Sequence, residues 1–190
     1  MSVFTPLERP ELEAFLEPYG LGRLKDFQGI AAGSENSNFF ISLEGGEFVL
    51  TLVERGPRAD MPFFVELLKR LHQAGLPVPY ALRTEQGEAL RELAEKPALL
   101  QPRLAGKHLA QPNAHHCQEV GTWLARLHLA TRDDILERRS DRGLDWMLEE
   151  GTVLALELHD EQLPLLRDSL QEVETLKARI LALPRANLHA

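Results

Sequence analysis

The chain has 190 residues, which suffices for one ordinary domain or for a small lobe plus part of a second. Its formal net charge of -8, with no block of Lys and Arg, argues against a general binder of nucleic acid or anionic membranes, because such proteins need clustered cations. Cys117 is the only cysteine, so an internal disulfide and a thiolate metal cluster are excluded. We expect a cytoplasmic protein without a signal peptide or a membrane-spanning segment.

The N-terminal part predicts one helix followed by a region of strands. Thr5-Pro6-Leu7-Glu8 has the spacing of a capping box with Pro at the first helical position, and Gly20 supplies a stop. These signals predict a helix over residues 7–19. From residue 24 to 53 the pattern is typical of strands, and Gly45-Gly46 predicts a hairpin turn because glycine tolerates positive φ at both positions.

A second helix is predicted over residues 60–74, between an opening Asp60-x-Pro62 and a closing Gly75. Its apolar residues recur with the i, i+3, i+4, i+7 spacing of one buried helix face: Phe64, Leu67, Leu68 and Leu71. Short strands are expected next at residues 81–84, 89–91 and 98–102, around a turn at Gln86-Gly87.

The composition changes near residues 103–112, and helical periodicity dominates from Asn113 onward. Two apolar stripes carry that periodicity, Cys117, Val120, Leu124 and Leu127 in the first, and Leu163, Leu166, Leu170, Val173 and Ile180 in the second. We therefore predict an α+β fold in which a small antiparallel-sheet lobe, residues 1–102, is joined by a connector, residues 103–112, to a helical lobe, residues 113–190.

A small polar run, Gly33-Ser34-Glu35-Asn36-Ser37-Asn38, lies between two predicted strands. Such a loop exposes backbone N–H groups and short polar side chains, which can cover a polyphosphate closely. No Gly-Lys-Ser/Thr follows, so it is not a Walker A loop. An ordinary hairpin loop remains the alternative, since Gly, Ser and Asn are favoured in turns for conformational reasons.

The order of the predicted elements is typical of kinases. A polar loop is followed by a strand containing Thr51, a helix carrying Glu66, further strands, and the segment Leu99-Leu100-Gln101-Pro102-Arg103 that leads into the connector. In that arrangement the loop covers phosphates, the strand and helix organise them, and the backbone of the connector recognises adenine. Taken singly, Glu66 could equally be a solvated helix residue, and Gln101 and Arg103 part of a surface loop.

Five segments resemble the aminoglycoside-phosphotransferase-like kinases and, within them, the bacterial homoserine kinases of that fold. They are Gly-Ser-Glu-Asn-Ser-Asn-Phe-Phe at 33–40, Phe-Val-Leu-Thr-Leu at 48–52, Gly-Leu-Pro-Val-Pro at 75–79, Gly-Thr-Trp-Leu-Ala-Arg-Leu-His at 121–128 and Leu-Pro-Arg-Ala-Asn-Leu-His-Ala at 183–190. The resemblance implies a protein-kinase-like fold and ATP- and Mg²⁺-dependent phosphorylation of the hydroxyl of L-homoserine, a step toward threonine.

The resemblance also implies roles for individual residues. The nucleotide would contact Gly33, Ser34, Asn36, Ser37, Asn38, Thr51, Glu66, Gln101 and Arg103. The wider superfamily usually carries a phosphate-contacting Lys where this chain has Thr51. In the family a His-x-Asp turn supplies the catalytic base, and this sequence ends at His189-Ala190. No residue of the chain is therefore assigned as catalytic or as a metal ligand, and the chain as given is expected to be inactive.

Three alternatives stay open. A sister kinase of the same fold could act on an amino alcohol, a sugar or an aminoglycoside. A non-catalytic protein could use the fold to bind nucleotide, and a mainly helical interaction module would bind none. The uncovered apolar faces of a partial helical lobe also predict self-association.

Overall fold

A computed structural model of the chain describes residues 4–31, 35–56, 58–133, 135–138 and 142–183. These residues form two compact units, one ending at Leu136 and the other spanning Glu137–Ala186. The predicted connector, residues 103–112, contains no helix or strand and lies inside the first unit. The division of the chain into lobes at that connector stays a prediction.

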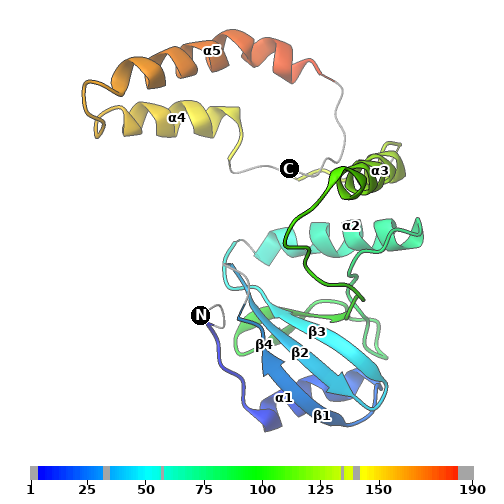
Figure 1. Ribbon diagram of the computed structural model, residues 1–190. Helices are drawn as coiled ribbons and strands as arrows, with labels where there is room; N and C mark the ends of the chain where they lie inside the picture. The colour runs from blue at the N-terminus through cyan, green and yellow to red at the C-terminus, as the bar shows by residue number, and fades with distance from the viewer. Residues whose placement is uncertain (1–3, 32–34, 57, 134, 139–141, 184–190) are drawn as a thin grey trace. The chain divides into compact units, whose positions relative to one another are not determined.

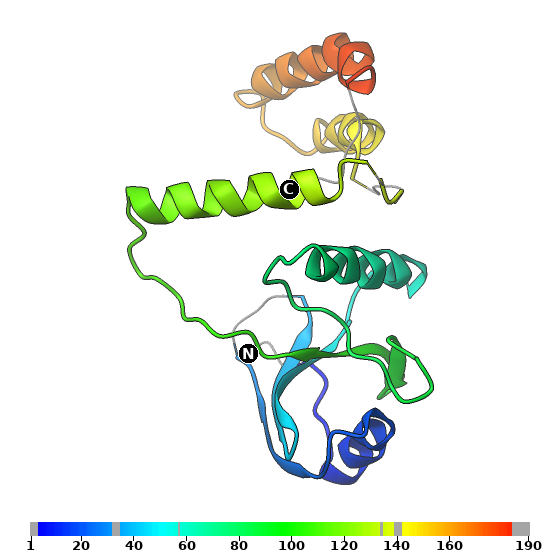
Figure 2. The same ribbon diagram turned by 90° about the vertical axis from the view of Figure 1, so that its right-hand side faces the viewer.

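The first unit contains a five-stranded antiparallel sheet in the order β1-β2-β3-β5-β4. Its strands are β1 (Leu24–Gly29), β2 (Ser37–Leu43), β3 (Gly46–Leu52), β4 (Arg91–Leu93) and β5 (Lys96–Pro102). The helix α1 (Arg9–Leu16), continued by a 3₁₀ turn (Glu17–Tyr19), and the helix α2 (Met61–Gln73) lie on opposite sides of the sheet, as Figures 1 and 2 show.

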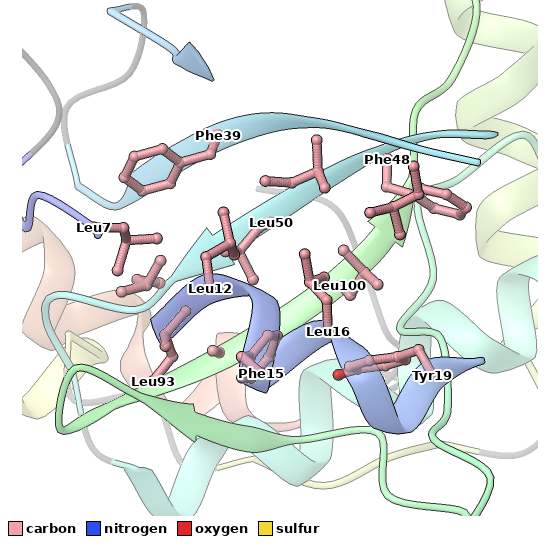
Figure 3. Packing of buried hydrophobic residues seen from close by; sticks show 14 residues of the cluster. Leu7, Leu12, Phe15, Leu16, Tyr19, Phe39, Phe48, Leu50, Leu93 and Leu100 are labelled. Atoms are coloured by element: carbon pink, nitrogen blue, oxygen red, sulfur yellow. The ribbon is translucent and has the colours of Figure 1, made fainter. Parts of the chain in front are cut away.

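The main hydrophobic core lies between α1 and the sheet (Figure 3). Residues of β2, β3 and β5 alternate between this face and the opposite one, because successive side chains of a strand point to opposite faces. The core is formed by Leu7, Leu12, Phe15, Leu16, Tyr19, Phe39, Ile41, Leu43, Phe48, Leu50, Leu52, Leu93, Ala98 and Leu100. Burial of these side chains is the main stabilising contribution to this unit.

The predicted start of the first helix is wrong by two residues. The helix begins at Arg9 with Pro10 in its first turn, and Glu8 at the N-cap makes no side-chain capping bond. Thr5 does not cap the helix, because it lies before the N-cap residue, and its hydroxyl instead donates to Glu54 Oε1 at 2.7 Å and accepts from Lys96 Nζ at 2.6 Å. Leu7, expected inside the helix, precedes it and packs into the core.

The predicted hairpin between β2 and β3 is confirmed, with its turn shifted to Glu44-Gly45. Leu43 pairs with Gly46, and of the two glycines only Gly46 has positive φ, at 141°. Gly45 is required for a different reason. Its N–H donates to Leu21 O at 2.9 Å, and a Cβ at this position would lie 2.8 Å from the same oxygen.

The second helix is confirmed, since α2 spans Met61–Gln73 with Asp60 at its N-cap. Its apolar face is less covered than the spacing predicts. Leu71 is buried and Leu67 and Leu68 are half-buried, whereas 36% of Phe64 is exposed.

The segment between α2 and β5 contains fewer strands than predicted. Residues 81–84 form no strand, although the Leu82 N–H donates to Leu100 O at 2.8 Å. The predicted turn at Gln86-Gly87 is present, with the Gly87 N–H donating to Thr84 O at 2.8 Å. The two later strands are β4 and β5, each close to a predicted one.

Three helices follow: α3 (Ala114–Ala130), α4 (Leu144–Leu154) and α5 (Leu163–Leu181). In the second unit α4 and α5 pack together, and Lys177 Nζ of α5 pairs with Asp145 Oδ1 of α4 at 2.8 Å. The predicted stripe of α3 is largely open, with Val120 58% exposed. Self-association through such exposed apolar side chains stays a prediction. None of the helices in the described segments is both long and apolar enough to cross a membrane.

Candidate functional site

Three of the predicted site residues meet on the face of the sheet opposite the α1 core. The hydroxyl of Thr51 lies 2.7 Å from Asn38 Oδ1 and 3.4 Å from Gln101 Oε1. The hydroxyl hydrogen can serve only one acceptor at a time, and the shorter contact has the geometry of a good hydrogen bond. Asn38 and Gln101 are therefore held on either side of Thr51.

Strand register explains why these side chains meet. Asn38 of β2 lies directly opposite Thr51 of β3, and Gln101 of β5 lies opposite Val49, two residues from Thr51 on the same face. The next row on this face is formed by Phe40, Val49 and Gln101. The face therefore presents the amides of Asn38 and Gln101 and the hydroxyl of Thr51, with the apolar side chains of Phe40 and Val49 beside them.

Asn36 continues the polar end of this face. Its Oδ1 accepts a hydrogen bond from the Glu54 N–H at 3.3 Å, and its backbone carbonyl accepts one from Asn38 Nδ2 at 3.4 Å. Gly33 and Ser34, predicted to cover phosphates with their backbone amides, lie outside the described residues.

Ser37 does not share this face, although it stands between Asn36 and Asn38 in sequence. Its side chain points to the core side, its exposed fraction is 0%, and its Oγ donates to Glu54 Oε1 at 2.5 Å. The hydroxyl also accepts from the N–H groups of Phe4 and Thr5, at 2.8 and 3.1 Å. The hydroxyl of Ser37 thus already has three partners within the protein.

Glu66 of α2 forms ion pairs within its own helix. One carboxylate oxygen lies 2.9 Å from Arg70 Nε and the other 3.1 Å from Lys69 Nζ. The hydrogen bonds from Arg70 and Lys69 lower the pKa of Glu66 below its ordinary value. The i, i+3 and i, i+4 spacing of these residues could have predicted both pairs from sequence.

The side chain of Arg103 packs beside the same face. Its guanidinium carbon lies 4.0 Å from the centroid of the Phe40 ring, and its Nη1 lies 3.6 Å from Glu47 Oε2. A cation over an aromatic face is attractive, so Arg103 covers one side of Phe40.

The backbone of the connector alternates in direction. The Arg103 N–H donates to Glu47 O of the neighbouring strand β3 at 3.1 Å, whereas Leu100 O on the opposite edge of β5 accepts from Leu82 N. By this alternation the Pro102 carbonyl points away from β3, and an extended backbone continued past Arg103 would turn the Leu104 N–H the same way. The backbone of this connector was predicted from sequence to recognise adenine, and strand periodicity identifies these two groups within it. A carbonyl acceptor and an N–H donor two residues apart match the amino group and ring nitrogen of adenine.

A buried ionic cluster near the start of β2 was also overlooked. Glu54 pairs with Lys96 and lies within hydrogen-bonding distance of Ser37 and Thr5. These residues are far apart in the chain, so no local sequence pattern links them. Burial by itself raises the pKa of Glu54, but hydrogen bonds from Lys96, Ser37 and Thr5 outweigh it and hold that pKa below its ordinary value.

His116 has a structural role at the start of α3. His116 Nδ1 accepts from the Asn113 N–H, and Asn113 Oδ1 accepts from the His116 N–H, each at 3.1 Å, which completes a capping box. Across the residues that the structure describes, no group of three or more His, Cys, Asp or Glu side chains is placed to hold a metal ion.

The sequence is similar to known phosphotransferases along most of its length. The family described as APH, phosphotransferase enzyme family, matches residues 26–190. Homoserine kinase of Pseudomonas aeruginosa (strain LESB58) is 70% identical over 190 residues, which are 100% of this chain and 60% of that protein. Homoserine kinase of Methylobacillus flagellatus is 36% identical over 190 residues, 100% of this chain and 59% of that protein. The chain thus spans about 60% of the length of these curated relatives.

Two solved structures share the fold at low sequence identity. Amicoumacin kinase in complex with AMP-PNP, Ca²⁺ and Ami gives a TM-score of 0.65 at 18% identity, covering 93% of this chain and 54% of that one. Spectinomycin phosphotransferase in complex with ADP and spectinomycin gives 0.53 at 12% identity, covering 80% and 48%. The predicted α+β, protein-kinase-like fold class is confirmed.

Proposed function

Because the chain belongs to the phosphotransferase enzyme family, we propose that the protein containing it transfers the γ-phosphoryl group of ATP to the side-chain hydroxyl of L-homoserine. The observation that carries this proposal is the high identity to a homoserine kinase along the entire chain. The reaction would be a cytoplasmic step on the way to threonine. The sister kinases and the non-catalytic nucleotide-binding module are the alternatives that the experiments below distinguish.

The geometry supports a nucleotide lying along the polar face of the sheet. The outward Pro102 carbonyl and Leu104 N–H would bind the adenine edge, and the apolar side chain of Val49 would lie against the base. Asn38 and Thr51 would then face the phosphates, together with the predicted backbone amides of Gly33 and Ser34.

Thr51 would contribute a hydrogen bond to this arrangement and no charge. Phosphoryl transfer relies on positioning and on neutralising the charge of the transferred group, a task for which Mg²⁺ is the usual cation. None of the described residues is assigned as a ligand of that ion or as the catalytic base, and the predicted turn at His189-Ala190 lies outside the described residues.

Glu66 keeps a place in the proposal in a modified role. Its carboxylate already holds Lys69 and Arg70, so we assign it to orienting these two cations on α2. An ion pair between Glu66 and residue 51, as in kinases with a Lys on the strand, is not available to this chain because Thr51 carries no charge.

The adenine assignment is tested with the chain itself. AMP-PNP should bind with a measurable Kd by isothermal titration calorimetry, and Leu104→Pro should raise that Kd about tenfold by removing one N–H donor. Leu104→Ala keeps the N–H and serves as the matched control. Equal affinity of both variants would contradict the placement of adenine, and a wild-type chain that binds no nucleotide would favour an interaction module.

The acceptor is tested with the longer protein that carries these residues. Given ATP and Mg²⁺, it should phosphorylate L-homoserine with a higher kcat/KM than an amino alcohol, a sugar or an aminoglycoside in the same assay. A preference for another acceptor would replace homoserine and leave the kinase assignment in place. Nucleotide binding without transfer to any acceptor would identify a binding module.

A further inference from the structure

One carboxylate of the first unit is almost enclosed at the end of β3. The side chain of Glu54 is 7% exposed and forms an ion pair with Lys96, whose side chain is 32% exposed. A buried charge is costly unless it is paired and hydrogen-bonded. The contacts of Glu54 therefore indicate what this arrangement holds in place.

The hydrogen bonds around Glu54 join four separate segments of the chain. Glu54 Oε1 accepts from Ser37 Oγ at 2.5 Å and from Thr5 Oγ1 at 2.7 Å, and Oε2 pairs with Lys96. Lys96 also donates to Thr5 Oγ1 at 2.6 Å, and Ser37 Oγ accepts from the N–H of Phe4 at 2.8 Å. Each hydroxyl donates once and accepts at least once, so the donors and acceptors are mutually consistent.

Glu54 also contacts Asn36, the residue before β2, through its backbone. Its N–H donates to Asn36 Oδ1 at 3.3 Å, while its carboxylate holds Ser37. Ser37 lies between Asn36 and Asn38, whose side chains belong to the candidate site. Fixing the backbone at Ser37 from the core side therefore fixes where its two neighbours point.

We propose that Glu54, held by Lys96 and Thr5, is a positioning residue that fixes the start of β2 so that Asn36 and Asn38 face the phosphates of a bound nucleotide. The inference rests on the proposed function. It goes beyond that function because it assigns a role to three residues that would not touch the nucleotide. Their effect should fall on the phosphate end of the ligand and spare the base, which the distant connector binds.

The test compares two ligands on the same 190-residue chain. Glu54→Gln keeps the size of the side chain and removes its charge. It should weaken AMP-PNP binding about tenfold, because Asn36 and Asn38 would no longer be held in position against the phosphates. Adenosine lacks phosphates, so its affinity should remain close to the wild-type value. The readout is the ratio of the two Kd values by calorimetry, which a general loss of folded protein would not change.

Two further variants separate positioning from stability. Thr5→Val removes one hydroxyl from the cluster and should shift the ratio in the same direction, whereas Thr5→Ser keeps the hydroxyl and should restore it. Glu92→Gln is the matched control, since it breaks an exposed ion pair with Arg58 and should leave both affinities unchanged. If circular dichroism shows that Glu54→Gln does not fold, the comparison of Thr5→Val with Thr5→Ser tests the proposal instead.

The outcomes distinguish this inference from the proposed function. A wild-type chain that binds AMP-PNP, with Glu54 and Thr5 variants that keep the wild-type ratio, would overturn the positioning role alone. Equal weakening of both ligands would also overturn it. A wild-type chain that binds neither ligand would overturn the proposed nucleotide site and this inference together.

Discussion

Thr51 and Asn38 lie directly opposite each other on β3 and β2, and the Thr51 hydroxyl donates to Asn38 Oδ1 at 2.7 Å. The same hydroxyl lies 3.4 Å from Gln101 Oε1 of β5. One short side chain thus contacts polar groups from both neighbouring strands. Thr51 therefore helps to hold the side chains of Asn38 and Gln101 in place on this face of the sheet.

Replacing Thr51 by Val should destabilise the first unit by about 1 kcal/mol, because the isosteric side chain leaves Asn38 Oδ1 without its donor. Thr51→Ser keeps the hydroxyl and should lose less. The free energy of unfolding in urea, followed by circular dichroism, measures both changes. A Val variant as stable as the wild type would show that this hydrogen bond contributes no net stability.

The pairing of Glu54 predicts a pH dependence of stability. The pKa of Glu54 is lower in the folded chain than its ordinary value of 4.5, so the folded state binds this proton more weakly than the unfolded state. The stabilisation is therefore fully present above about pH 4.5 and is lost as the pH falls through the lowered folded pKa. Glu54→Gln should cost about 3 kcal/mol at neutral pH, since it breaks a buried pair.

Urea unfolding of the wild type and of Glu54→Gln at a series of pH values tests this prediction. The difference between their free energies of unfolding should shrink as the pH falls below the ordinary value of 4.5. A difference that stays constant down to acid pH would contradict the assigned shift.

Gly151 of α4 faces Leu170 of α5 so closely that an added Cβ would lie 2.4 Å from Leu170 Cδ2. Gly151→Ala should therefore destabilise the helix pair by about 1 kcal/mol or more, despite the better helix propensity of Ala. At Gly121 of α3 a Cβ would meet no atom within 4 Å, so Gly121→Ala should stabilise by up to about 1 kcal/mol. Thermal melting followed by far-UV circular dichroism compares the two variants. An equal rise of the melting temperature in Gly151→Ala and Gly121→Ala would contradict the close contact between Gly151 and Leu170.

Tyr19 is buried beside Arg91, whose guanidinium carbon lies 5.9 Å from the centroid of its ring. Burial raises the pKa of Tyr19, and the positive charge of Arg91 partly offsets this rise. Arg91→Met should therefore raise the pKa of Tyr19 further. The chain has only two tyrosines, so an absorbance titration in a Tyr80→Phe background reports Tyr19 alone. An unchanged pKa would show that Arg91 does not act on the phenol.

Features with local signals were predictable from sequence, and features that depend on distant partners were not. The bounds of α2 follow from Asp60 and Gly75, which act within one turn of the helix ends. Thr5 has the same local pattern as a capping residue, but its hydroxyl bonds to Glu54, 49 residues away. A local signal cannot distinguish these two uses of one hydroxyl.

The candidate site shows the same division. Asn36, Ser37 and Asn38 form one polar run in sequence, yet the two-residue period of β2 places Ser37 on the core face and its neighbours on the other. Thr51 could be singled out from sequence only by resemblance. Its meeting with Gln101 depends on the pairing of β3 with β5, which single-sequence periodicity does not specify.

The alternation along β2 restricts how this part of the chain can change in length. Deleting one residue inside the strand would turn Asn38 toward the leucines beneath α1 and would bring Phe39 out to the polar side, exchanging the two sets of side chains at once. An added residue is better tolerated at the Glu44-Gly45 bend, where the alternation is interrupted, provided that a glycine still lies against Leu21 O. Homologous chains should therefore differ in length at that bend and keep the span from Ser37 to Leu43 intact.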